Sequence, residues 1–106
     1  MKILIDECID QRLRHSFPEH DCLTAGFAGL TGLQNGQLLD AAESAGFDVL
    51  VTADQNIPYE QNLKGRRISI LILCASTNRL RDLLALMPGV KDALLAIGLG
   101  EVITLR

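Results

Sequence analysis

The sequence has few of the residues that mark secreted, disulfide-stabilised or membrane proteins. Its 106 residues include no tryptophan, one tyrosine and three phenylalanines. The three cysteines, Cys8, Cys22 and Cys74, form no CxxC pair, which argues against a disulfide framework and a structural zinc site. No apolar run reaches the roughly 18 residues of a membrane span. The first ten residues turn acidic at once and do not resemble a secretion signal, so we expect a cytoplasmic protein.

The sequence does contain enough apolar residues for a core. Hydrophobic residues make up 48% of the chain, and its length fits a single domain over residues 1–106. Apolar runs predict strands at 2–5, 21–25, 49–52, 68–73 and 101–105. Helical patterns lie between them at 8–17, 35–45, 57–63, 79–87 and 90–97, the third being a short helix or turn. This alternation predicts a three-layer α/β fold, with a mostly parallel sheet of about five strands and helices on both faces.

Asn35 is the expected N-cap of the second helix, and Gly46 is the residue expected just past its end. We expect Pro88-Gly89 to separate the last two helices.

Two aspartates stand where parallel strands place functional side chains. Asp6 follows the first predicted strand and Asp54 follows the third. If those strands are neighbours, both carboxylates face one crevice beyond the strand ends, where α/β proteins bind ligands. Two close carboxylates repel each other, and hard oxygen ligands suit Mg²⁺ or Mn²⁺, so the pair predicts a weak metal site. The alternative is that each aspartate only caps the helix that follows it.

Neutral polar residues complete the candidate site. Helix geometry puts Gln37 in the first turn, within reach of the crevice, while Asp40 and Glu43 lie further along on the solvated side. Gln37 is therefore the expected third ligand, although it is an amide. Asn56 is a neutral ligand or holds a water, or it simply forms a turn.

Charge is unevenly distributed along the chain. Residues 1–63 hold ten acids and three bases, whereas residues 64–106 hold seven bases and three acids. Lys64, Arg66 and Arg67 are candidate contacts for the phosphates of RNA, although a solvated face explains the same pattern.

Two segments resemble a small PIN-like family of bacterial proteins. They are KILIDE at the start and NGQLLDAAESAGFDVLVTADQNIPYEQNLKGRRI at 35–68, and the likeness covers residues 1 to about 75. The resemblance implies a PIN-like α/β fold and a metal-dependent ribonuclease ancestry, often as the toxin half of a toxin–antitoxin pair. It places Asp6 and Asp54 in the family's acidic site. Position 37 is usually Glu in the family, position 56 is Asp in many members, and some have Asp where this chain has Asn35.

The sequence is compatible with three functions. The first is a weak Mg²⁺- or Mn²⁺-dependent endoribonuclease, with RNA and an antitoxin as partners. The second is a catalytically silent PIN-like binding module. The third is a phosphoacceptor receiver-like domain, with Ser76 or Thr77 as its switch hydroxyl, but Leu105-Arg106 stands where a receiver needs lysine. Separately, residues 83–100 hold more apolar side chains than one helical face can bury, which predicts a homodimer.

Overall fold

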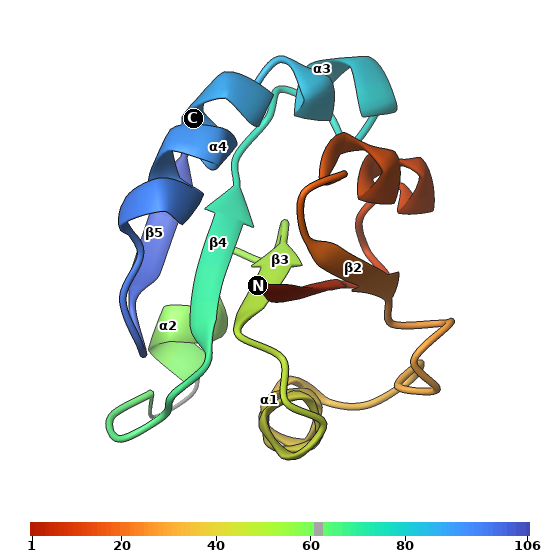
Figure 1. Ribbon diagram of the computed structural model, residues 1–106. Helices are drawn as coiled ribbons and strands as arrows, with labels where there is room; N and C mark the ends of the chain where they lie inside the picture. Colours follow the sequence, from red (N-terminus) through yellow and green to blue (C-terminus); the bar gives the residue numbers. More distant parts are fainter. Residues whose placement is uncertain (61–62) are drawn as a thin grey trace.

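The computed structural model describes residues 1–60 and 63–106, without the side chains of residues 59 and 60. Five strands form one parallel sheet in the order β2-β1-β3-β4-β5 (Figure 1). The strands are β1 (Lys2–Ile5), β2 (Asp21–Thr24), β3 (Val49–Thr52), β4 (Ser69–Leu73) and β5 (Val102–Leu105). The predicted strands and the α/β fold are therefore confirmed, with each strand end within one residue of its expected place.

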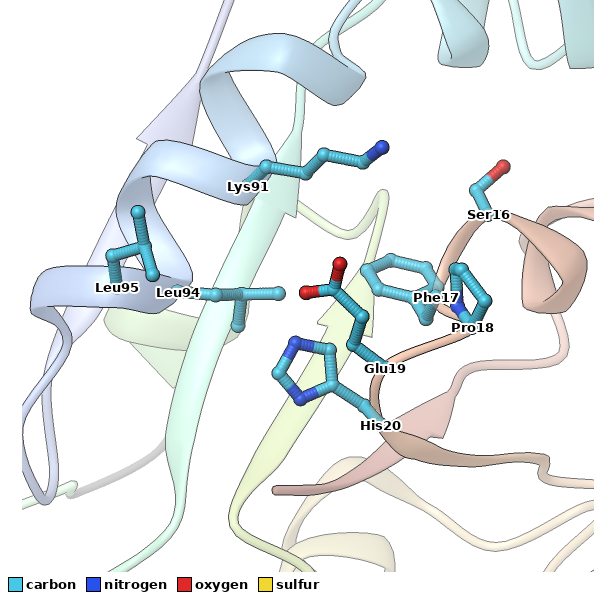
Figure 2. A pocket seen from close by; sticks show the side chains of 8 residues that line it. All are labelled: Ser16, Phe17, Pro18, Glu19, His20, Lys91, Leu94 and Leu95. Atoms are coloured by element: carbon cyan, nitrogen blue, oxygen red, sulfur yellow. The ribbon is translucent and has the colours of Figure 1, made fainter.

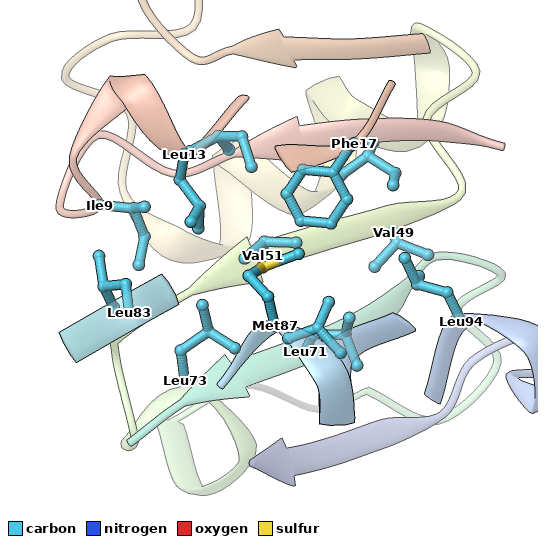
Figure 3. Packing of buried hydrophobic residues seen from close by; sticks show 13 residues of the cluster. Ile9, Leu13, Phe17, Val49, Val51, Leu71, Leu73, Leu83, Met87 and Leu94 are labelled. Carbon is cyan, nitrogen blue, oxygen red and sulfur yellow. The ribbon is translucent and has the colours of Figure 1, made fainter. Parts of the chain in front are cut away.

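Helices cover both faces of this sheet and divide the core into two clusters. One face packs against η1 (Gln11–Ser16), α3 (Leu80–Leu84) and α4 (Met87–Ala96), as Figure 3 shows. The other face packs against α1 (Asn35–Ser44) and α2 (Ile57–Glu60). The central strands β3 and β4 bury every residue, as expected for parallel strands covered on both sides. In the described residues, no helix has both the length and the apolarity to cross a membrane.

The first helical segment is shorter and tighter than predicted. Ile9, Leu13 and Phe17 are all buried, so the predicted apolar face is confirmed. However, the helix is a 3₁₀ helix that begins at Gln11, because the side chain of Asp10 accepts a hydrogen bond from a backbone N–H in its first turn. The residue before a proline avoids the α conformation, and Pro18 limits the segment to six residues. A segment of this length suits a 3₁₀ helix.

The helix α1 occupies its predicted place, but its N-cap is not the predicted residue. The backbone of Gln34 is extended and that of Asn35 is already helical, so Gln34 is the N-cap and the prediction of Asn35 was wrong. At the other end, Gly46 has a φ of 83° just past the helix, which confirms its predicted role. Of the predicted helical segment 57–63, the structure shows α2 at 57–60, and residues 61–62 lie outside the described part.

The break between the last two helices lies earlier than expected. It falls between the end of α3 at Leu84 and the start of α4 at Met87, so the predicted break at Pro88-Gly89 was wrong. Pro88 instead stands in the first turn of α4, where its missing N–H has no helical partner to lose.

One crossover of the sheet differs in hand from the other three. The steps from β2 to β3, β3 to β4 and β4 to β5 all move in the same direction across the sheet. Yet α1 and α2 lie on one face while α3 and α4 lie on the other, beside η1. The first crossover, from β1 to β2, moves in the opposite direction and lies on the opposite face compared with the next two crossovers. Because the two reversals cancel, these three crossovers have the same hand. Because parallel crossovers are right-handed in about 98% of cases, we assign the exception to the β4–β5 crossover.

The chain reverses its direction across the sheet between β1 and β3. It leaves β1 for β2 on one side and then returns to β3 on the other side. The crevice beyond the carboxyl ends of two such strands is where doubly wound sheets bind their ligands. Asp6 and Asp54 follow these two strands.

Gly100 holds the start of β5 against the segment before β4, and its replacement tests this contact. Its N–H donates to the carbonyl of Arg67, its φ is 67°, and a Cβ at this position would lie 2.5 Å from the carbonyl oxygen of Arg66. We predict that Gly100→Ala lowers the free energy of unfolding by about 2–4 kcal/mol, because backbone strain adds to a steric clash. Gly29→Ala is the matched control, since its φ is 76° but its Cβ would meet nothing. Urea denaturation checks this, and equal losses in the two variants would contradict it.

Candidate functional site

Asp6 is held at the end of β1 by its own backbone and by its neighbours. Its side chain is buried, with 8% of the residue exposed. Its N–H donates to the carbonyl of Val51 at 2.9 Å, which continues the pairing of β1 with β3. One carboxylate oxygen accepts from the N–H of Glu7 at 2.8 Å, and the other accepts from the hydroxyl of Thr52 at 2.7 Å. The carboxylate of Asp6 therefore bonds residues at the ends of β1 and β3. The helix cap expected as its alternative role belongs to Asp10, which is the N-cap of η1.

Asp54 lies two residues past β3 and is half-buried. Its Oδ2 accepts from the side-chain amide of Asn35 at 2.8 Å, and its Oδ1 accepts from the backbone N–H of Asn56 at 2.9 Å. The first bond ties the start of α1 to the site, and the second forms the turn that leads into α2. Asp54 thus forms the turn before α2 rather than the helix cap that was its alternative role, and it also bonds the first residue of α1.

The hydroxyl of Thr52 links the two aspartates. It donates to the carboxylate of Asp6 at 2.7 Å and accepts from the backbone N–H of Asp54 at 3.1 Å. Thr52 is completely buried, so its hydroxyl has no access to water and both bonds stay formed in the fold. Residues 46 positions apart in sequence are thereby fixed at one edge of the sheet. The bond between Thr52 and Asp6 joins two different strands, so the sequence alone does not identify it.

Gln37 does not reach the aspartates. Its side chain is exposed, and its Oε1 lies 3.4 Å from the backbone N–H of Gln34, which is the arrangement of a helix N-terminal cap. The first turn of α1 does contact the site, but through Asn35 rather than through Gln37. The rotation of the helix was misjudged because the helix begins one residue earlier than the predicted N-cap allowed. Asn56 is exposed and contributes its backbone N–H to Asp54.

The three basic residues proposed to contact RNA lie near the amino ends of the strands, on the opposite side of the sheet from Asp6 and Asp54. They precede β4, whereas Asp6 and Asp54 follow the ends of their strands, and a four-residue strand is about 13 Å long. Arg66 donates from Nη1 to carboxylates of both Asp40 and Glu43 at 2.8 Å, and these contacts raise the pKa of its guanidinium. Its side chain is only 18% exposed. Arg66 therefore anchors the chain before β4 to α1 and is not available to phosphates.

Lys64 and Arg67 are exposed, and the backbone N–H of Arg67 donates to Glu43 at 3.2 Å. The structure does not bring this cluster to the acidic edge.

The donors at the acidic edge are oxygens, which fit Mg²⁺ or Mn²⁺ rather than zinc. Each carboxylate oxygen of the pair accepts one hydrogen bond and keeps capacity for another ligand. Only two charges are available, since among the described residues no group of three His, Cys, Asp or Glu side chains is placed to hold a metal. Mg²⁺ often uses one or two carboxylates together with waters, so the donor set fits this ion, with few charges to hold it.

Cys8 lies beside this edge, with its sulfur 3.5 Å from the hydroxyl of Thr52. Since that hydroxyl donates to Asp6, the S–H of Cys8 is the donor in this contact. Burial raises the pKa of the Cys8 thiol above its usual value, so the sulfur carries its proton at neutral pH. A protonated thiol is neither a metal ligand nor a nucleophile. All three cysteines are free, as predicted.

A hollow with apolar walls lies away from the aspartates. Figure 2 shows it between α4 and residues 16–20, with Leu94 and the carboxylate of Glu19 extending into it, Phe17 and Pro18 on one side, and Lys91 above. Its volume is about 160 Å³. Residues 16–20 precede β2, so the hollow lies near the amino ends of the strands. At that distance it cannot contribute to chemistry at Asp6 and Asp54.

The fold and the two aspartates define a class of protein. It is a doubly wound α/β protein with two carboxylates at the point where the chain reverses its direction across the sheet. Comparisons of the chain with protein-family models, curated proteins and solved structures found no match. The resemblance to PIN-like proteins therefore stays a prediction from the quoted segments.

Removing the Thr52 hydroxyl tests whether it holds the site together. We predict that Thr52→Val, which keeps the shape of the side chain, lowers the free energy of unfolding by about 1–3 kcal/mol, since it leaves a buried oxygen of Asp6 without its donor. Thr52→Ser keeps the hydroxyl and is expected to lose less. Thr104→Val on the exposed side of β5 is the matched control. Chemical denaturation at neutral pH measures all three, and equal midpoints for Thr52→Val and Thr104→Val would contradict the role.

The anchoring role of Arg66 has a similar test. We predict that Arg66→Gln costs about 2 kcal/mol of stability, because charged hydrogen bonds to Asp40 and Glu43 are lost together. Arg67→Gln, an exposed neighbour, is expected to change stability by less than about 0.5 kcal/mol. Thermal and urea unfolding of both proteins decide the point. A stable Arg66→Gln variant with weakened RNA binding would restore the earlier interpretation of this residue.

Proposed function

We propose that this protein is a cytoplasmic, weak, metal-dependent PIN-like endoribonuclease. The observation that carries the proposal is the bond network in which Thr52 joins Asp6 to Asp54 across the β1–β3 pair. It fixes the carboxylate of Asp6 beside the backbone of Asp54 where the chain reverses across the sheet, and that is the position at which doubly wound sheets bind ligands. The quoted likeness of KILIDE and LVTADQN to the PIN-like family supports the same function.

In this proposal Asp6 and Asp54 hold Mg²⁺ or Mn²⁺. A bound ion of this kind activates water and stabilises the charge that develops on a phosphodiester. Asn35 holds Asp54 in place through its amide, and Thr52 keeps Asp6 oriented from within the core. The neutral amide of Asn35, which lies beside Asp54, adds no charge, so the ion is held weakly and cleavage is slow.

A catalytically silent binding module is the second candidate. The observation in its favour is that each oxygen of both carboxylates already accepts a hydrogen bond from the protein. Such a network is stable without an ion, and it would persist after catalysis had been lost. A receiver-like domain has less support, because the hydroxyl of Thr77 donates to Asp82 and accepts from the N–H of Arg79, so it is engaged beside the start of α3.

The partners in this proposal are RNA, an antitoxin and a second copy of the chain. Leu95 on α4 and Leu99 after it are 88% and 73% exposed. A homodimer that covers these two leucines would account for the apolar excess of residues 83–100.

Adding one carboxylate beside Asp54 tests the metal site. The amide nitrogen of Asn35 lies 2.8 Å from Asp54, so Asn35→Asp places a third charge in the site. We predict that this variant binds Mn²⁺ about tenfold more tightly than wild type, because the extra charge stabilises a divalent ion. It should also lose stability without metal and regain it when Mn²⁺ is added. Gln37→Glu is the matched control, since residue 37 turns toward Gln34 instead.

Calorimetric titration, melting temperatures with and without Mn²⁺, and single-turnover cleavage of labelled RNA are the measurements. The gain of Asn35→Asp should vanish when Asp54 is also changed to Asn. Equal Mn²⁺ binding by wild type and Asp54→Asn would rule out the site. Metal binding without RNA cleavage in any of these proteins would support the silent module.

A further inference from the structure

A groove runs from the acidic edge to the open side of β2. It consists of two hollows that share Gln11, Thr24 and Gly26 and are therefore continuous. The inner hollow, of about 350 Å³, is bordered by Asp6 and Glu7. The outer hollow, of about 430 Å³, is lined by residues of η1 and of the edge strand β2. Thr24 is the last residue of β2, and Asp6 and Asp54 follow the neighbouring strands β1 and β3, so this line of residues crosses roughly 10 Å at about 4.8 Å per strand.

Phe27 stands at the outer end of the groove and is 81% exposed. Its position is fixed, because its N–H donates to the hydroxyl of Thr24 at 3.1 Å and the next residue, Ala28, donates to the carbonyl of Thr24 at 3.0 Å. An exposed phenylalanine on an ordered turn is a surface that another molecule can cover. Exposed aromatic rings in grooves are the platforms on which unpaired bases stack.

Arg14 supplies the positive charge of the same hollow. Its Nη1 donates to the backbone carbonyl of Gln11 at 3.1 Å, which holds the guanidinium at the wall of the groove. In the part of the chain that the structure describes, Arg14 forms no ion pair with a carboxylate. The neighbouring Arg12 differs, because its charge is matched by Asp10 at 2.6 Å. Arg14 is therefore available to a phosphate.

We propose that this groove binds a single-stranded RNA segment next to the site of cleavage, with a base stacked on Phe27 and a phosphate paired with Arg14. The inference rests on the proposed function for its choice of RNA. It replaces Lys64, Arg66 and Arg67 as the RNA contacts, since they lie at the other edge of the sheet. The ring of Phe27 can stack only on a base that is not paired in a helix, so the groove selects single strands over duplex.

Binding of fluorescein-labelled RNA in EDTA tests the groove without the metal site. The probes are a 10-nucleotide uridine-rich single strand and a duplex of the same length, followed by fluorescence anisotropy at low salt. We expect the wild-type chain to bind the single strand more tightly than the duplex. Phe27→Ala should weaken single-strand binding about tenfold, the order of one lost base–aromatic stack, and Phe27→Trp should restore it. Arg14→Gln should weaken binding and reduce its dependence on salt.

Two variants near the amino ends of the strands serve as controls, Val102→Ala for exposed apolar surface and Lys91→Gln for charge. Both are expected to bind RNA like wild type. The inference is overturned if wild type binds neither probe, or if Phe27→Ala and Arg14→Gln bind as wild type does. It is also overturned if light scattering shows a dimer that Phe27→Ala dissociates, since Phe27 would then be a protein contact. Loss of Mn²⁺ binding or cleavage with the groove intact would instead refute the proposed function alone.

Discussion

The pairing of β1 with β3 is the contact on which the rest of the structure depends. Three residue pairs, from Ile3–Val49 to Ile5–Val51, join segments far apart in the sequence. All six side chains are buried, so the two strands are fixed by packing from both faces as well as by hydrogen bonds. The pairing decides which residues meet beyond the strand ends. Asp6, Thr52 and Asp54 are neighbours only because these two strands are neighbours.

The strands could be predicted from the sequence because their signal is local and strong. The run Ile70–Leu73 is apolar throughout, and a continuous apolar run is typical of a buried parallel strand. Helix ends were less predictable. The break before Met87 carries no glycine or proline, whereas Pro88, which looked like the break, lies inside α4. A proline is compatible with the first turn of a helix, so its presence alone could not show on which side the helix lay.

The site was predicted in part, and the errors have a common cause. The two aspartates were found because a residue after a strand end must lie at the sheet edge. Which residue of α1 faces them depends on how that helix is turned about its axis, and each residue along it changes the direction of the side chain by about 100°. Asn35 therefore took the place expected for Gln37. The groove with Arg14 and Phe27 had no sequence signal, because it depends on how η1 lies against β2.

The unusual hand of the β4–β5 crossover has a consequence for how the molecule opens. With α3 and α4 on the face of η1, Val102 on the other face of β5 is 38% exposed. β5 is also an edge strand with one neighbour, so few buried contacts hold it. Segments of this kind open without global unfolding. We expect its amide protons to exchange with solvent well before those of β1, β3 and β4, which makes residues 101–106 a separate cooperative unit and leaves the acidic edge intact when they detach.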